Sequence, residues 1–216
     1  MSWLIGIAAA LALIGAGVRA VLAPAFPRLE YRRSGFPPDP YGFTTAERVR
    51  WAGITWDYLL NDEDASFLAD LRFDDGSPVY GPREVAHMRD VKTVIQIALR
   101  VCYGALTALT VIGLVTWRRG GFELFKRGLA RGGWIVVGLA GAIALTVLIG
   151  ILLSPDVFWG FFSAFHAVFF EGDSWLFLYS DTLIRLFPIR FWQDAFLLAA
   201  IIAVGGGLAL ARTFKT

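Results

Sequence analysis

The chain has 216 residues, of which 56% are hydrophobic and 18% charged, and its formal net charge is +2 at pH 7. This composition is too apolar for an ordinary soluble domain and is typical of a protein that crosses a membrane several times. The small positive charge comes from short basic segments, so it bears on membrane orientation, and we expect no nucleic acid partner.

Four apolar stretches predict membrane-spanning helices, at about residues 3–22, 95–117, 134–153 and 191–211. Each is close to 20 residues long, which at about 1.5 Å per residue is enough to cross about 30 Å of hydrocarbon. The first stretch is long for the apolar core of a secretory signal and no basic residue precedes it, so we expect it to be retained. The sequence therefore predicts an all-α membrane protein with a single integral membrane domain over residues 1–216.

The distribution of charge predicts the orientation of these spans. Basic residues gather in the expected loop 118–133 and in the C-terminal tail, whereas the segments 24–90 and 155–190 carry more acidic than basic residues. Short basic segments usually stay in the cytoplasm. We therefore expect both termini in the cytoplasm and the two acidic segments on the outer side of the membrane.

The first outer segment should form a helical cap. Its prolines between Pro24 and Pro40 predict an extended start. Thr44 and Glu47 then have the spacing of a capping box, which predicts the beginning of an amphipathic helix that ends near Asn61.

A long helix should follow from Pro82 to Trp117, because nothing in that stretch breaks it. Its length of about 54 Å exceeds the membrane thickness, so its first turns should project outward and place His87 at the level of the lipid headgroups. Basic residues near its outer end either anchor the helix at the interface or hold lipid phosphate: Arg89, Lys92 and Arg100.

The second outer segment should contain an interfacial helix. Residues 154–156 predict the start of a helix. The stretch that follows is uncharged from Val157 to Phe170 and includes His166. Its small residues, such as Gly160 and Ala164, predict a stripe that another helix can approach closely. A further short helix should begin after a cap at Ser180–Asp181.

The two histidines are the candidate catalytic groups. Both lie on the expected outer side at the lipid boundary, and imidazole exchanges protons near neutral pH without special tuning. A purely local role is the alternative, because Ser163 is one turn before His166 and Asp90 one turn after His87. A metal would need a third ligand such as Asp90, Asp173 or Asp181, and no histidine-rich spacing supports one, so we expect no metal and no cofactor.

Three motifs carry a resemblance to a known family: residues 87–92 (HMRDVK) ahead of a span, residues 165–170 (FHAVFF) with Trp175 following, and residues 180–188 (SDTLIRLFP). Together with the order of the spans, they resemble the bacterial four-span family that contains lipoprotein intramolecular transacylase. The resemblance implies transfer of the sn-2 fatty acyl chain of a diacylglyceryl lipoprotein to the amino group of its N-terminal cysteine, with membrane lipid around the site.

For this reaction we expect the residues to have different roles. His166 is expected to accept a proton from the amine and His87 to stabilise the oxyanion or protonate the departing glycerol oxygen, although the reverse assignment stays open. The expected supporting residues are Asp90, Asp173, Asp181 and Ser163, and the expected substrate-binding residues are Arg89, Lys92, Arg100, Phe162, Phe169 and Trp175. The alternatives are another membrane lipid hydrolase or acyltransferase, or a protein that binds lipid or lipoprotein without catalysis.

Overall fold

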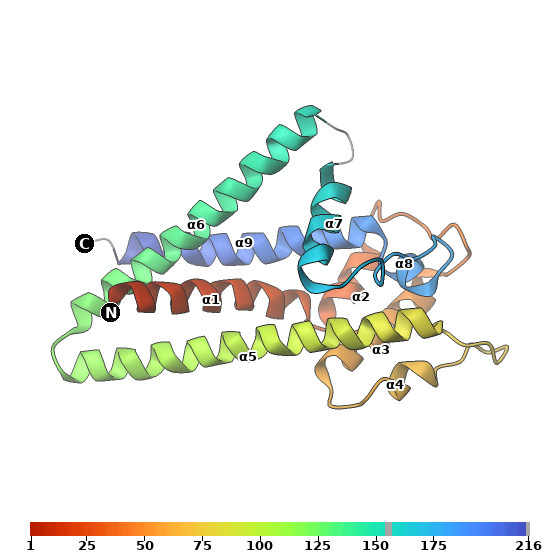
Figure 1. Ribbon diagram of the computed structural model, residues 1–216, viewed down its shortest axis with the longest axis horizontal. Coiled ribbons are helices and arrows are strands. Elements are labelled where there is room, and N and C mark those ends of the chain that lie inside the picture. Colours follow the sequence, from red (N-terminus) through yellow and green to blue (C-terminus); the bar gives the residue numbers. More distant parts are fainter. Residues whose placement is uncertain (154–156, 215–216) are drawn as a thin grey trace. The chain divides into compact units, whose positions relative to one another are not determined.

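The computed structural model describes residues 1–153 and 157–214, without the side chains of 149–153. Within this part of the chain the fold is helical, with no strand (Figure 1). In chain order the helices are α1 (Ser2–Val21), α2 (Ala25–Arg32), α3 (Thr45–Leu60), α4 (Ser66–Ala69), α5 (Pro82–Arg118), α6 (Phe122–Leu153), α7 (Val157–Phe169), α8 (Thr182–Leu186) and α9 (Ile189–Thr213).

The chain divides into two compact units. One, here called the membrane unit, comprises Met1–Val21, Ala98–Trp159 and Phe196–Thr216. The other, here called the polar unit, comprises Leu22–Ile97 and Gly160–Ala195. The expectation of a single integral domain stays a prediction.

Among the described residues, α1, α5, α6 and α9 are long and apolar enough to cross a membrane. This result confirms the four predicted spanning helices. The expected basic loop 118–133 is wrong in extent, because α6 already begins at Phe122 and carries Lys126, Arg127 and Arg131 on its first turns. Long basic side chains extend readily from a helix that reaches beyond the hydrocarbon, so their charge does not force a loop.

The membrane unit is held together by close approach of small residues. A Cβ atom built on Gly132 of α6 would lie 2.5 Å from the Cβ of Ala9 and 2.6 Å from the carbonyl oxygen of Gly6, both on α1. A Cβ on Gly128 would lie 2.5 Å from the Cβ of Ile5. Lipid chains are as apolar as leucine, so shape complementarity of this kind is what stabilises contacts between spanning helices.

The polar unit confirms the predicted capping box of α3. The Glu47 N–H donates to Thr44 Oγ1 over 3.2 Å, and the Thr44 N–H donates to Glu47 Oε2 over 2.8 Å. Asn61 ends the helix as expected. The predicted extended start of this segment is wrong, because α2 includes Pro27; proline is tolerated in a first turn, where its missing N–H has no helical partner in any case.

An aromatic cluster forms the core of the polar unit. Phe191 is fully buried, and its ring centroid lies 5.2 Å from those of Phe26 and Phe187, 5.3 Å from Trp56 and 5.7 Å from Tyr31. These residues come from α2, α3, the end of α8 and the start of α9. The cluster therefore fixes the short outer helices against one another within this unit.

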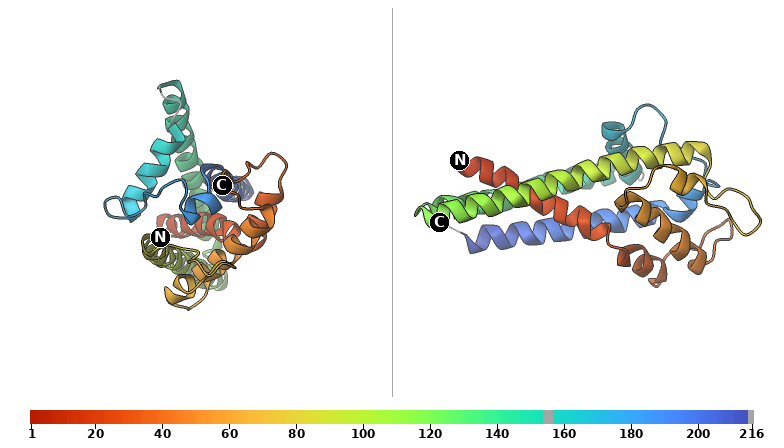
Figure 2. Two further views of the ribbon diagram at one scale, coloured as in Figure 1. Left: turned by 90° about the vertical axis from the view of Figure 1, so that its right-hand side faces the viewer. Right: turned by 90° about the horizontal axis from the view of Figure 1, so that it is seen from below.

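Helix α5 runs without a break from Pro82 to Arg118, as predicted (Figure 2). The predicted start of α7 at residues 154–156 lies outside the described residues. The face of α7 that becomes buried is formed by Phe162 and His166. The expected packing of a helix on its small-residue stripe is wrong for Gly160, since a Cβ there would meet no described atom within 4 Å.

Candidate active site

His87 lies one turn into α5, in the part of the helix that precedes its apolar stretch, and belongs to the polar unit. It is 8% exposed and sits among rings. Its centroid lies 4.8 Å from Phe170, 5.4 Å from Phe177 and 6.2 Å from His166. Its Nδ1 atom is buried without a hydrogen-bond partner among the described residues, which is unusual for a buried polar atom.

His166 lies on α7 in the same unit and is also 8% exposed. Its ring centroid lies 4.0 Å from Phe162 and 4.7 Å from Trp175. Its Nδ1 lies 2.8 Å from the carbonyl oxygen of Phe162, one turn earlier on the helix. A carbonyl oxygen only accepts, so Nδ1 must carry the proton, and in the neutral ring Nε2 is then the free base.

The two rings are close and nearly parallel, with centroids 6.2 Å apart and planes 22° from parallel. Two hydrogen bonds of about 2.9 Å that meet at one atom span up to about 6 Å. The ring separation is therefore close to the span of two such hydrogen bonds.

Burial keeps both imidazoles neutral. Desolvation and the neighbouring His166 lower the pKa of His87 to about 4, although Asp90 opposes the shift. Desolvation also lowers the pKa of His166, and its hydrogen bond to Phe162 opposes this shift. At neutral pH each ring is thus in the form that accepts a proton and that can also donate one from its N–H.

None of the expected carboxylates orients a ring in the described structure. Asp90 is half exposed and pairs with the exposed Arg89 over 3.5 Å. Asp181 Oδ2 accepts the Leu178 N–H over 2.8 Å, and the Asp173 main-chain carbonyl accepts from Arg83 over 3.3 Å. Asp181 takes the cap position of α8, as predicted, but its side chain makes no cap hydrogen bond among the described residues.

The orienting group that the structure does show for His166 is the main-chain carbonyl of Phe162. Ser163, expected to support the ring, is partly buried beside it and is not the atom that holds Nδ1. Phe162 and Trp175, expected to bind substrate, lie directly against the His166 ring. Phe169 is 46% exposed and packs on Phe165 at 5.0 Å.

The three basic residues that were expected to bind substrate have different surroundings in the structure. Lys92 is buried, and its Nζ donates to Asn61 Oδ1 over 2.9 Å and to the Glu63 carbonyl over 2.5 Å, while it lies 4.1 Å from the Tyr58 ring centroid. Lys92 thus ties α5 to the end of α3 rather than facing lipid. Arg89 is exposed in the polar unit, and Arg100 is exposed in the membrane unit.

Sequence reasoning missed Glu84, which lies one turn before His87. Its buried carboxylate accepts the N–H groups of Gly81 and Leu183, each over 2.7 Å. Burial raises the pKa of Glu84, and these two N–H groups oppose the rise. Glu84 therefore provides from α5 the side-chain acceptor for the first turn of α8. An acid in the first turn of a helix that begins with proline was the available signal.

Comparison with known proteins decides the family. A family model described as lipoprotein intramolecular transacylase Lit matches residues 3–192. A protein of Aquifex aeolicus (strain VF5), named only as uncharacterized, is 30% identical over 200 residues, which cover 93% of this chain and 86% of that protein. The chain belongs to the lipoprotein intramolecular transacylase family. As a member of this family it is an acyltransferase and a multi-pass membrane protein.

Solved structures of a transacylase share the fold. The membrane integral lipoprotein intramolecular transacylase Lit from Bacillus cereus superposes with a TM-score of 0.78 at 18% identity, over 99% of this chain and 92% of that one. Two structures of the same protein carry a replaced histidine. The arginine variant has a TM-score of 0.69 at 16% identity, and the alanine variant 0.68 at 17%; both cover 99% of this chain, with 88% and 90% of theirs.

Proposed function

We propose that this transacylase moves the sn-2 acyl chain of a diacylglyceryl lipoprotein to the α-amino group of its N-terminal cysteine, leaving the lyso form. The amine nitrogen attacks the ester carbonyl and an amide bond forms. The bond from that carbonyl to the sn-2 glycerol oxygen breaks, and the proton lost by the nitrogen ends on this oxygen as an alcohol. The observation that carries the proposal is the pair of buried, neutral imidazoles 6.2 Å apart.

His166 is the base in this account. Its Nδ1 proton is held by the Phe162 carbonyl, which leaves the Nε2 lone pair to take the proton of the attacking amine. His87, whose Nδ1 has no partner in the described structure, stabilises the tetrahedral oxyanion or returns a proton to the departing glycerol oxygen. The tautomer of His166 thus supports the assignment that the sequence left open.

A covalent nucleophile is not required for this reaction. Donor ester and acceptor amine belong to one molecule, so orientation and proton transfer supply what an acyl-enzyme step would otherwise supply. The aromatic rings around the pair, among them Phe162, Phe170 and Trp175, keep water from the carbonyl and favour transfer to nitrogen over hydrolysis.

The orientation in the membrane is part of the proposal. The basic residues on the first turns of α6 and in the C-terminal tail favour the cytoplasm for that end of the spans and for both termini. The histidines then face outward, on the extracytoplasmic side of the bacterial cytoplasmic membrane, where diacylglyceryl lipoproteins are the substrate and membrane lipid surrounds the site.

The test is production of the lyso form in a host whose lipoproteins are only diacylated. Mass spectrometry of a reporter lipoprotein should show an N-acylated cysteine with one O-acyl chain when the wild-type gene is expressed. Expression of His87→Ala or His166→Ala at equal membrane levels should leave the diacyl form unchanged. Free fatty acid with no N-acyl product would identify a hydrolase, and wild-type product from both variants would overturn the histidine roles.

A further inference from the structure

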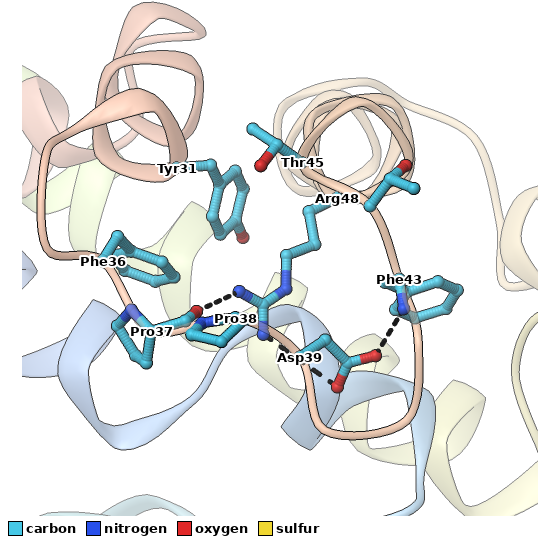
Figure 3. Close-up of a pocket in the computed structure, with 9 residues that line it drawn as sticks. Tyr31, Phe36, Pro37, Pro38, Asp39, Phe43, Thr45 and Arg48 are labelled. Carbon is cyan, nitrogen blue, oxygen red and sulfur yellow. Dashed lines mark hydrogen bonds and ion pairs between the residues drawn. The ribbon is translucent and has the colours of Figure 1, made fainter.

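A polar pocket of about 280 Å³ lies in the polar unit beside the N-terminus of α3 (Figure 3). Tyr31, Phe36 and Pro38 give it apolar walls, and Asp39 and Arg48 give it charged ones. In Figure 3 the Arg48 side chain extends from α3 toward Asp39. The volume is just below the range of about 300–1,000 Å³ that is usual for small-molecule sites, so it suits a short piece of a larger ligand.

Arg48 is only 4% exposed and does not use all its donors. One terminal nitrogen, Nη1, donates to the Pro37 carbonyl over 2.7 Å. The other, Nη2, lies 4.0 Å from Asp39 Oδ1, which is beyond hydrogen-bond distance. Nε is buried without a partner among the residues described.

Asp39 offers the complementary group. Its Oδ2 accepts the Phe43 N–H over 2.8 Å and two N–H groups of Arg185 over 3.0 and 3.1 Å. Burial raises its pKa, but the Phe43 N–H and Arg185 outweigh burial and hold the pKa below its ordinary value, so the group is charged. Its Oδ1 is buried and, within the part of the chain described, has no hydrogen-bond partner.

Arg48 and Asp39, which both line this pocket, thus carry one unused donor and one acceptor without a hydrogen bond. Buried polar groups without partners are rare in folded proteins because each one is costly, so such groups need an explanation. The main chain of a peptide carries both complements, a carbonyl that accepts and an N–H that donates.

Building on the proposed function, we infer that this pocket binds the main chain of the lipoprotein substrate, within the first residues after its lipidated cysteine. Arg48 Nε donates to a substrate carbonyl, and Asp39 Oδ1 accepts a substrate N–H. The apolar walls contact the neighbouring side chains. The pocket recognises the peptide by its main chain, which suits an enzyme whose substrates share the lipidated cysteine and differ beyond it.

Other parts of the substrate fit the pocket less well. An acyl chain would leave Arg48 Nε and Asp39 Oδ1 buried without hydrogen-bond partners, which is costly. A phosphate group prefers two parallel N–H groups of one guanidinium, but Nη1 is engaged by Pro37 and Nη2 faces Asp39. Asp39 would also repel a phosphate.

Helix α8 connects the pocket to the histidine pair. Near its end, Arg185 binds Asp39 and the Leu186 carbonyl accepts the Tyr31 hydroxyl over 2.7 Å. At its start, the Leu183 N–H is held by Glu84, which precedes His87 by one turn. Five helical residues extend about 8 Å, and extended peptide about 3.4 Å per residue, so a few substrate residues bridge the two ends of α8.

The experiment compares two synthetic substrates in nanodiscs: a diacylglyceryl-cysteine amide, and the same group followed by four residues. Thr45→Trp fills the pocket from its exposed rim, and Ala46→Trp, one position later and outside the lining, is the matched control. With the longer substrate, kcat/KM of Thr45→Trp should fall about tenfold, the loss expected from one or two hydrogen bonds to charged groups. With the cysteine amide, both variants should equal wild type.

Arg48→Lys, which keeps the charge and lacks Nε, should show the same dependence on peptide length. An equal loss on both substrates, no loss on either, or a loss that follows phosphatidylethanolamine content and not peptide length would overturn the inference. Failure of wild type to convert either substrate would instead refute the proposed function, so the two failures are distinguishable. If Arg48→Lys does not fold, the Thr45→Trp comparison decides alone.

Discussion

The membrane unit and the polar unit are stabilised by different forces. In the membrane unit, α1 and α6 meet where Gly132 faces Ala9 and Gly6, with no room for a side chain. The polar unit instead buries charged groups such as Arg48 and Glu84, each held by main-chain atoms. Packing by shape alone suits an apolar surround, whereas the proposed proton transfer and peptide recognition need polar groups, which the polar unit supplies.

The largest effect should come from the histidines of the polar unit. Replacing His87 or His166 with glutamine keeps a polar side chain of similar reach but removes proton transfer, so kcat should fall about 10²–10⁴-fold. Single-turnover assays with a synthetic diacyl lipopeptide measure this loss. If the two glutamine variants keep more than a tenth of wild-type activity, the polar unit does not supply acid–base catalysis.

An added side chain at the contact between α1 and α6 should destabilise the membrane unit. Gly132→Val would force a side chain into Ala9 and the Gly6 carbonyl, which should lower the free energy of unfolding by about 1–3 kcal/mol. Gly138→Val on the same helix is the control, because a Cβ there meets nothing within 4 Å. Thermal unfolding in detergent compares them, and equal midpoints would show that close approach of α1 and α6 is not what stabilises this unit.

Substitution of Glu84 tests whether a buried carboxylate stabilises the polar unit. Glu84→Gln keeps one acceptor and places an NH₂ group against a main-chain N–H, which should destabilise the protein by about 1–3 kcal/mol. The exposed capping-box Glu47→Gln should cost less. Unfolding midpoints and turnover of both variants check the difference, and the idea fails if Glu84→Gln is no more harmful than Glu47→Gln.

The smallest effect near neutral pH concerns the protonation of His87. His87 has a pKa of about 4, below its ordinary 6.5, so the unfolded chain binds more protons between these values and acid lowers stability as pH falls from 6.5 toward 4. Above pH 6.5 the group contributes no pH dependence. The chain has two histidines, so NMR of ¹⁵N-histidine-labelled protein can follow both rings. His87 should stay neutral at pH 5.5, and titration near 6.5 would contradict its burial.

Hydropathy and local signals were enough to predict the spans, the Thr44–Glu47 capping box and the uninterrupted α5. These features depend on neighbours in the sequence, as helices and caps do. Predictions were wrong where one local signal is compatible with more than one structure. Pro27 lies in the first turn of α2 rather than in an extended segment, and basic residues expected in a loop belong to α6.

Most details of the site depend on tertiary contacts and were not predictable. The hydrogen bond of His166 is local, to a main-chain carbonyl one turn earlier, but no sequence pattern marks it. Lys92 binds Asn61, 31 residues earlier, and Glu84 binds Leu183, 99 residues later. The sequence predicted that both histidines lie at the lipid boundary on one side of the membrane. The distance of 6.2 Å between their ring centroids is known only from the folded structure.

The most direct test of the central claim is a crossover measurement. Two diacyl lipopeptides of different mass, one with a deuterated sn-2 chain, are mixed with the enzyme, and the N-acylated products are analysed by mass spectrometry. Transfer within one molecule, assisted by two imidazoles and no covalent nucleophile, predicts that each deuterated chain stays on its own peptide and that no product forms with His166→Gln. Exchange of label between the peptides, or undiminished product with that variant, would contradict the account.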